Sequence, residues 1–218
     1  MIKMCGIIGY CSTNSRNARK IVIEGLKKME YRGYDSWGIG IKAGNSISVE
    51  KKVGSISDAD QKSELDCNYA IGHTRWATHG KVTEENAHPH LSYNGNICVV
   101  HNGIIENYRE LKKELQEKNY EFKSDTDTEV IPHLIEEHYR KTNDFQTSVK
   151  KASECFRGNY AFIAMCNDFE GLIGVKNGAP LLIGYEKEES FITSDVVAFI
   201  ERTKKVTYLD DNEMVVLG

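Results

Sequence analysis

The stretch MIKMCGIIGY, residues 1–10, places a Cys-Gly pair directly before a short apolar run. Residues 6–10 (GIIGY) predict a strand near the start of the fold, because isoleucine favours extended backbone. Met4 stands directly before Cys5 and is a second candidate initiator. If translation began at Met4 and this residue were removed, Cys5 would carry both a thiol and a free α-amine.

Two interpretations of Cys5 follow from this position. A thiol of ordinary pKa, about 8.5, is only a few per cent thiolate at neutral pH and needs a base to act as a nucleophile. An α-amine titrates at about 7.7–8.0 and would lie within reach of the thiol on the same residue, directly or through one water. The alternative is a small buried cysteine that begins a strand.

Composition limits the class of protein. The 218 residues predict one domain, and a net charge of -4 gives no basic surface for nucleic acid or an anionic membrane. We find no apolar run long enough to span a bilayer and no signal-peptide pattern. Six cysteines without a CxxC pair indicate reduced thiols in the cytoplasm, buried except at Cys5. The histidines lack zinc spacing and no GxGxxG opens a helix, so neither a metal nor a cofactor is expected.

Periodicity predicts an α+β fold. The helices cluster along the chain instead of alternating with strands, which favours antiparallel sheets covered by helices over a doubly wound parallel sheet. Asn107 and Glu110 are expected to form a capping box. Predicted helices cover residues 17–33, 106–120, 126–141, 147–156 and a short 194–202; predicted strands cover 6–10, 36–42, 45–53, 69–76, 96–103, 159–167, 171–177, 180–186, 190–193 and 214–218.

The motif GHTRWATHG, residues 72–80, follows a predicted strand. Its Arg75 could form a fork for a carboxylate or a phosphate, and Trp76 could exclude solvent beside it. Thr78 and His79 would then lie in the same loop. A surface loop with a core tryptophan is an equal alternative.

The motif HNGIIEN, residues 101–107, contains Asn102 and Gly103 after an apolar strand. An Asn-Gly pair first indicates a turn. The Asn102 amide and the Gly103 N–H could instead stabilise an oxyanion.

The motif SDTDTEV, residues 124–130, precedes a predicted helix. Asp125 and Asp127 would therefore cap that helix. A carboxylate in this segment could alternatively bind a substrate ammonium group.

Together these motifs resemble one known family closely. CGIIGY (5–10), EYRGYDSWG (30–38), GHTRWATHG (72–80), NAHPH (86–90), VVHNGIIENY (99–108) and SDTDTEVI (124–131) occur in order over nearly the whole chain. They resemble the glutaminase domain of the isomerising glucosamine-6-phosphate synthases, a class II glutamine amidotransferase of the N-terminal-nucleophile hydrolase group. The resemblance implies a four-layer αββα sandwich spanning residues 5–218, preceded by an initiator or processing segment of residues 1–4.

The resemblance also implies residue roles. Cys5 would attack the glutamine side-chain amide with its own α-amine as base, through a γ-glutamyl thioester, and Asn102 and Gly103 would form the oxyanion hole. The remaining expected contacts to glutamine are Arg75 with the α-carboxylate, Asp127 with the α-ammonium, and Trp76, Thr78 and His79 as further pocket residues.

The implied partner is a sugar-isomerase domain or subunit that binds fructose 6-phosphate and receives the ammonia, with a homodimer formed through that domain. Three alternatives stay open from the sequence. They are a glutaminase domain of another amidotransferase such as amidophosphoribosyltransferase, an inert regulatory module if residues 1–4 are retained, and a Cys–His hydrolase that pairs Cys5 with His88 or His101.

Overall fold

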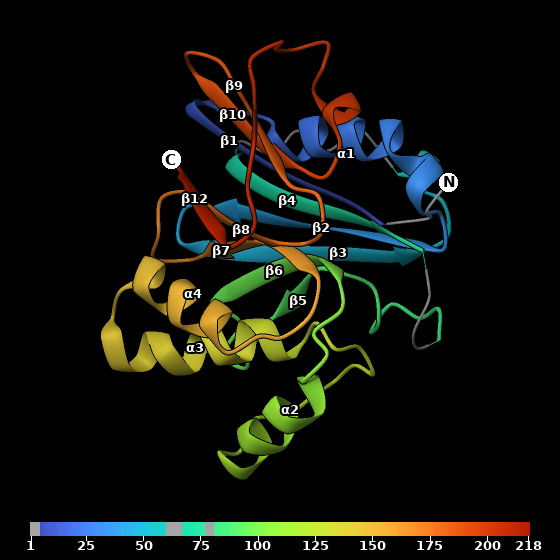
Figure 1. The fold of residues 1–218 in the computed structure, drawn as a ribbon. Coiled ribbons are helices and arrows are strands. Elements are labelled where there is room, and N and C mark those ends of the chain that lie inside the picture. The colour runs from blue at the N-terminus through green and yellow to red at the C-terminus, as the bar shows by residue number, and fades with distance from the viewer. Residues whose placement is uncertain (1–4, 60–66, 77–80) are drawn as a thin grey trace.

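The computed structural model describes residues 5–59, 67–76 and 81–218, and these form two antiparallel sheets with helices on their outer faces (Figure 1). The first sheet has the order β11 (Val206–Tyr208), β9 (Leu182–Tyr185), β10 (Glu189–Thr193), β1 (Gly6–Arg16), β4 (Cys67–Arg75), β2 (Ser36–Ala43) and β3 (Ser46–Val53). The second has the order β12 (Glu213–Leu217), β8 (Leu172–Asn177), β7 (Tyr160–Cys166), β6 (Ile97–Gly103) and β5 (His90–Leu91).

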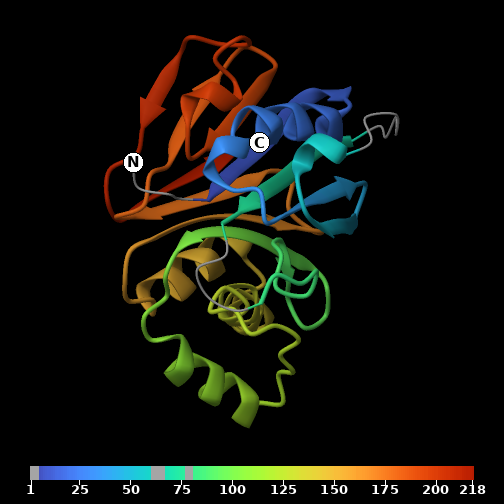
Figure 2. The same cartoon turned by 90° about the vertical axis from the view of Figure 1, so that its right-hand side faces the viewer.

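The helices form the two outer layers. Helix α1 (Ala18–Lys28) packs on β1 and β4 of the first sheet. Helices α2 (Tyr108–Glu117), α3 (Val130–Thr142) and α4 (Phe145–Glu154) lie on the side of the second sheet, where α3 contacts β6 and α4 contacts β8. Figures 1 and 2 show the resulting order of helix, sheet, sheet, helix from two directions. The expected αββα sandwich is therefore confirmed.

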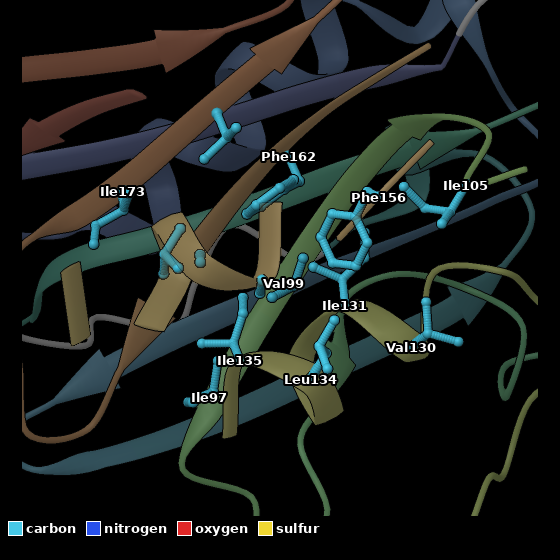
Figure 3. Packing of buried hydrophobic residues seen from close by; sticks show 14 of the residues in the cluster. Ile97, Val99, Ile105, Val130, Ile131, Leu134, Ile135, Phe156, Phe162 and Ile173 are labelled. Carbon is cyan, nitrogen blue, oxygen red and sulfur yellow. The ribbon is translucent and has the colours of Figure 1, made fainter. Parts of the chain in front are cut away.

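Alternating side chains divide the interior into three cores. In β6, Ile97 and Val99 face the helices, whereas Cys98 and Val100 face the other sheet. This is the two-residue period of a strand that is buried on both faces. Figure 3 shows the helix-side core, in which Val99 packs with side chains of α3. The same alternation decides which side chains at the strand ends point between the sheets.

Several predicted elements differ from the observed ones. The predicted 17–33 helix ends at Lys28 and is followed by a 3₁₀ turn over Glu30–Arg32, and the predicted 194–202 helix is a 3₁₀ turn over Val196–Ala198. A third 3₁₀ turn spans Ile56–Asp58. The two short strands β5 and β11 were not predicted.

The expected capping box at the start of α2 is wrong. The Asn107 side chain makes no bond to its own helix. Its amide instead donates to the Cys155 carbonyl at 2.9 Å, and its oxygen accepts the Arg157 N–H at 3.0 Å. A long-range contact therefore replaces the local one.

The predicted burial of the cysteines is confirmed with one exception. No disulfide joins any two of the six cysteines, and Cys11, Cys67, Cys98 and Cys166 are buried as expected. Cys155 is exposed at the end of α4, so its predicted burial is wrong.

Candidate active site

Cys5 lies at the junction of two neighbouring strands. It precedes β1, whose Gly6 pairs with Thr74 near the end of antiparallel β4. This register brings Cys5 to the residues that follow β4. The Trp76 N–H donates to the Cys5 Sγ at 3.2 Å.

The Cys5 thiol is a poor nucleophile without help. Burial raises its pKa, and this effect exceeds the opposing effects of the Trp76 N–H and the nearby Arg75 charge. The thiol is therefore protonated at neutral pH and needs a base. The rings of His88 and His101 make no hydrogen bond to Sγ in the described part of the chain: both His88 nitrogens and His101 Nδ1 bond to other groups. This geometry does not favour the Cys–His alternative.

Asn102 and Gly103 end strand β6 beside Cys5. Both pair with β7, through Ala161 and Tyr160, so the interpretation of this dipeptide as a turn is wrong. The Asn102 amide Nδ2 donates to the Cys5 carbonyl at 2.8 Å. One of its two N–H groups is thus used to hold the backbone of the candidate nucleophile.

Gly103 requires its glycine. Its φ of 107° lies in a region that other residues rarely adopt. A Cβ atom at this position would also overlap the carbonyl oxygen of Asn159. The backbone at residue 103, which lines the cavity together with Asn102, can therefore adopt this conformation only with glycine.

Opposite charges line the same cavity. Arg75 is 5% exposed at the end of β4, and its Nη1 donates to the Lys81 carbonyl at 3.2 Å. The Asp127 carboxylate accepts the Ile105 N–H at 2.7 Å. Capping of α3 by the Asp127 side chain is therefore wrong, since α3 begins at Val130 and its first turn receives no side-chain cap.

Six of the eight predicted site residues surround one cavity of about 110 Å³. They are Cys5, Arg75, Trp76, Asn102, Gly103 and Asp127. The remaining two, Thr78 and His79, lie outside the described residues. The sequence motifs therefore identified the cavity, although they gave no distances within it.

Sequence reasoning missed a group of buried histidines in the wall of this cavity. His73, His88 and His101 line it, and His90 packs against His88 with ring centroids 4.9 Å apart. Burial lowers the pKa of each ring, and for His73 the value is about 3. From the sequence, the histidines were considered as metal ligands and His88 or His101 as a base for Cys5, but not as a packed group of neutral rings. No cluster suited to a metal ion occurs among the residues described.

The described chain also contains no helix of sufficient length and hydrophobicity to cross a bilayer.

Comparisons with known proteins identify the family. The family model "Glutamine amidotransferase domain" matches residues 73–201. Proteins named glutamine–fructose-6-phosphate aminotransferase [isomerizing] are 45% identical over 98% of this chain in Clostridium perfringens and 47% identical over 96% in Pyrococcus horikoshii.

A solved glutamine phosphoribosylpyrophosphate amidotransferase from B. subtilis superimposes on 97% of this chain and 47% of its own, with a TM-score of 0.79 and 28% identity. This chain spans only 35% of the length of the Clostridium relative and 36% of the Pyrococcus one. With more than half of its residues matched by the family model, the chain belongs to the glutamine amidotransferase domain family.

Proposed function

We propose that this chain hydrolyses the side-chain amide of L-glutamine with Cys5 as the nucleophile. The observation that carries the proposal is a single cavity containing a thiol, an amide donor and two opposite charges. A second candidate is an inert regulatory module, which requires that residues 1–4 stay attached to Cys5. The intact mass of the purified protein separates the two candidates, since retention of residues 1–4 favours the inert module.

The charges suit the head group of a free amino acid. The Arg75 guanidinium can form a paired contact with the α-carboxylate, and the Asp127 carboxylate can accept from the α-ammonium. With the head group bound between them, the side-chain amide extends toward Cys5 and Asn102. Peptide-bound glutamine lacks this zwitterion and should be a poor substrate.

The reaction proceeds in two steps. The freed α-amine of Cys5 takes the thiol proton, and sulfur attacks the amide carbon to give a tetrahedral oxyanion that receives N–H bonds from Asn102 and Gly103. The carbon–nitrogen bond then breaks, and the leaving nitrogen takes the proton from the α-amine and departs as ammonia. Water next attacks the γ-glutamyl thioester, which releases glutamate and restores the thiol.

This reaction requires removal of residues 1–4, because Met4 otherwise blocks the Cys5 nitrogen as an amide. Initiation at Met4 followed by methionine removal would leave residues 5–218 as the active domain. The roles of Thr78 and His79 as further pocket residues, and a cytoplasmic location, remain predictions.

The proposed ammonia acceptor is fructose 6-phosphate, bound by an isomerase domain or subunit outside this chain. Two observations support it: the relatives above carry fructose 6-phosphate in their names, and their identity to this chain of 45–47% exceeds the 28% of the phosphoribosylpyrophosphate enzyme. A homodimer formed through the isomerase domain is part of the same proposal.

A glutaminase assay tests the proposal. A chain begun at Met4, with Cys5 confirmed as the first residue by intact mass, should release glutamate and ammonia in equal amounts. Added hydroxylamine should divert the thioester to γ-glutamyl hydroxamate. The Cys5→Ala variant should form neither glutamate nor the hydroxamate. Equal turnover by Cys5→Ala, or none by the processed chain, would refute it.

A further inference from the structure

The edge of strand β6 is unusual where it reaches the active site. Strand β5 pairs with β6 only through His90↔Val99 and Leu91↔Cys98, whereas β7 accompanies β6 as far as Gly103. Beyond Val99, no described strand therefore continues the ladder on the β5 side. The backbone groups of His101 point to this uncovered edge.

Two imidazole rings take the place of the missing strand. The His101 N–H donates to His88 Nδ1 at 3.2 Å, and the His101 carbonyl accepts from His73 Nε2 at 3.1 Å. A strand residue in an antiparallel ladder would provide this same pair of one acceptor and one donor. Both backbone groups of His101 are thus satisfied by side chains on this edge, and opposite Phe162 of β7 His101 occupies a pair that is not hydrogen-bonded.

The hydrogen bonds define the tautomer of each ring. A carbonyl only accepts, so His73 must carry its proton on Nε2, and His88 Nδ1 must be unprotonated to accept an N–H. Both rings are neutral because burial, together with neighbouring positive charge, lowers their pKa values. The rings also stack, with centroids 4.0 Å apart, so each restricts the orientation of the other.

The two rings come from different parts of the fold. His73 lies in β4 of the first sheet, two residues before Arg75. His88 lies in the loop before β5, where its backbone packs so closely on β2 that a Cβ at Gly38 would overlap the His88 carbonyl oxygen. The stacked pair therefore connects the first sheet to the end of β6 in the second.

The same rings reach the segment that carries Asp127. The Thr128 hydroxyl lies 3.3 Å from His88 Nε2 and 2.8 Å from His101 Nδ1. His73, His101 and Thr128 are thus each within two residues of a proposed site residue, namely Arg75, Asn102 and Asp127 respectively. The contacts form one continuous hydrogen-bonded group.

We propose that His73 and His88 are positioning residues that set the Asn102–Gly103 donors relative to the Cys5 sulfur. This inference rests on the proposed function, because it concerns the oxyanion step of that reaction. Neither ring needs to touch glutamine or transfer a proton. Misplacement of reacting groups by about 1 Å can lower a rate about 100-fold, so loss of either bond should act mainly on kcat.

Paired substitutions at each histidine test the proposal. Glutamine carries an amide N–H near the position of Nε2, and asparagine carries an oxygen near the position of Nδ1. His73→Gln and His88→Asn therefore retain the required bond, whereas His73→Asn and His88→Gln move it. We expect kcat within about tenfold of the parent in the first two and about 100-fold lower in the last two, with KM for glutamine within about threefold throughout. The proposal would be overturned if the two variants at each histidine lost the same factor in kcat, or if only the KM for glutamine changed.

Amide hydrogen exchange supplies a readout independent of catalysis. The His101 N–H should exchange faster in His88→Gln than in His88→Asn, while Ile163 in the centre of β7 should exchange at the parent rate in both. Unchanged exchange at His101 would overturn the positioning role even if the enzyme is active. No glutaminase activity in the processed parent chain would instead refute the proposed function, so the two failures are distinguishable.

Discussion

Mild acid should destabilise this fold strongly, because four buried imidazoles must stay neutral in it. Burial lowers the pKa of His73, His88, His90 and His101, for His73 to about 3. In the unfolded chain each titrates near 6.5. Since the folded pKa values lie below the unfolded one, the unfolded chain binds the extra protons. Stability is therefore complete above pH 6.5 and is lost as the pH falls below it.

The size of this effect follows from the number of rings. An imidazole with a pKa of 6.5 in the unfolded chain that stays neutral in the folded one lowers the free energy of unfolding by about 1.4 kcal/mol when the pH falls from 7.5 to 5.5. His73, with a pKa of about 3, and His88 and His90, with pKa values well below 6.5, give a loss of about 4 kcal/mol, to which His101 adds in the same direction. This loss is a large fraction of the 5–15 kcal/mol typical of a domain. Ordinary carboxylates titrate mainly below this window, near pH 4.

Urea unfolding at pH 7.5, 6.5 and 5.5 measures the loss directly. His90→Asn removes one ring and should reduce the pH-dependent loss by roughly 1 kcal/mol. His90 is the suitable choice because it does not line the cavity. A change in unfolding free energy of less than about 1.5 kcal/mol over the whole range would refute the reasoning, since it would mean that the rings accept protons in the folded state.

Three substitutions test the site and its support. Asn102→Ala should lower kcat by about 10²–10³-fold with little change in KM, as loss of one oxyanion donor does; a change confined to KM would contradict this. Arg75→Lys should raise KM for glutamine about tenfold or more, because lysine lacks the planar fork; an unchanged KM would show that the α-carboxylate binds elsewhere. Gly38→Ala should lower the unfolding free energy by about 1–3 kcal/mol in urea titrations, since backbone atoms of His88 must move. The matched control Gly44→Asn, in an open hairpin turn with φ of 56°, should cost well under about 1 kcal/mol, and equal losses would contradict the steric argument.

The layered fold was predictable because the predicted helices cluster along the chain instead of alternating with strands, which favours antiparallel sheets covered by helices. The adjacent predicted strands 36–42 and 45–53 pair as the hairpin of β2 and β3, in whose turn Gly44 adopts positive φ. Strands β5 and β11 were missed because two or three residues show no measurable alternation. The Asn107 and Asp127 side chains were assigned to local caps, but each bonds to a segment far along the chain, which periodicity does not reveal.

The sequence motifs predicted which residues would line the candidate site, but not the contacts that hold those residues in place. The motifs that contain Cys5, Arg75, Asn102 and Asp127 meet in one cavity, as expected from the family resemblance. The histidine contacts were not predictable, because the roles of His73 and His88 depend on where β5 ends. A buried neutral histidine and a metal-binding histidine look the same in sequence.

The free α-amine of Cys5 is the central requirement of the proposed chemistry, and one comparison tests it. Glutamate release is measured for two chains of confirmed intact mass, one starting at Cys5 and one retaining residues 1–4. Because a positioned base contributes about 10²–10⁴-fold, the first should turn over at least about 100-fold faster than the second. Equal rates from the two chains would contradict the account, since the nitrogen of Cys5 is an amide in the longer one.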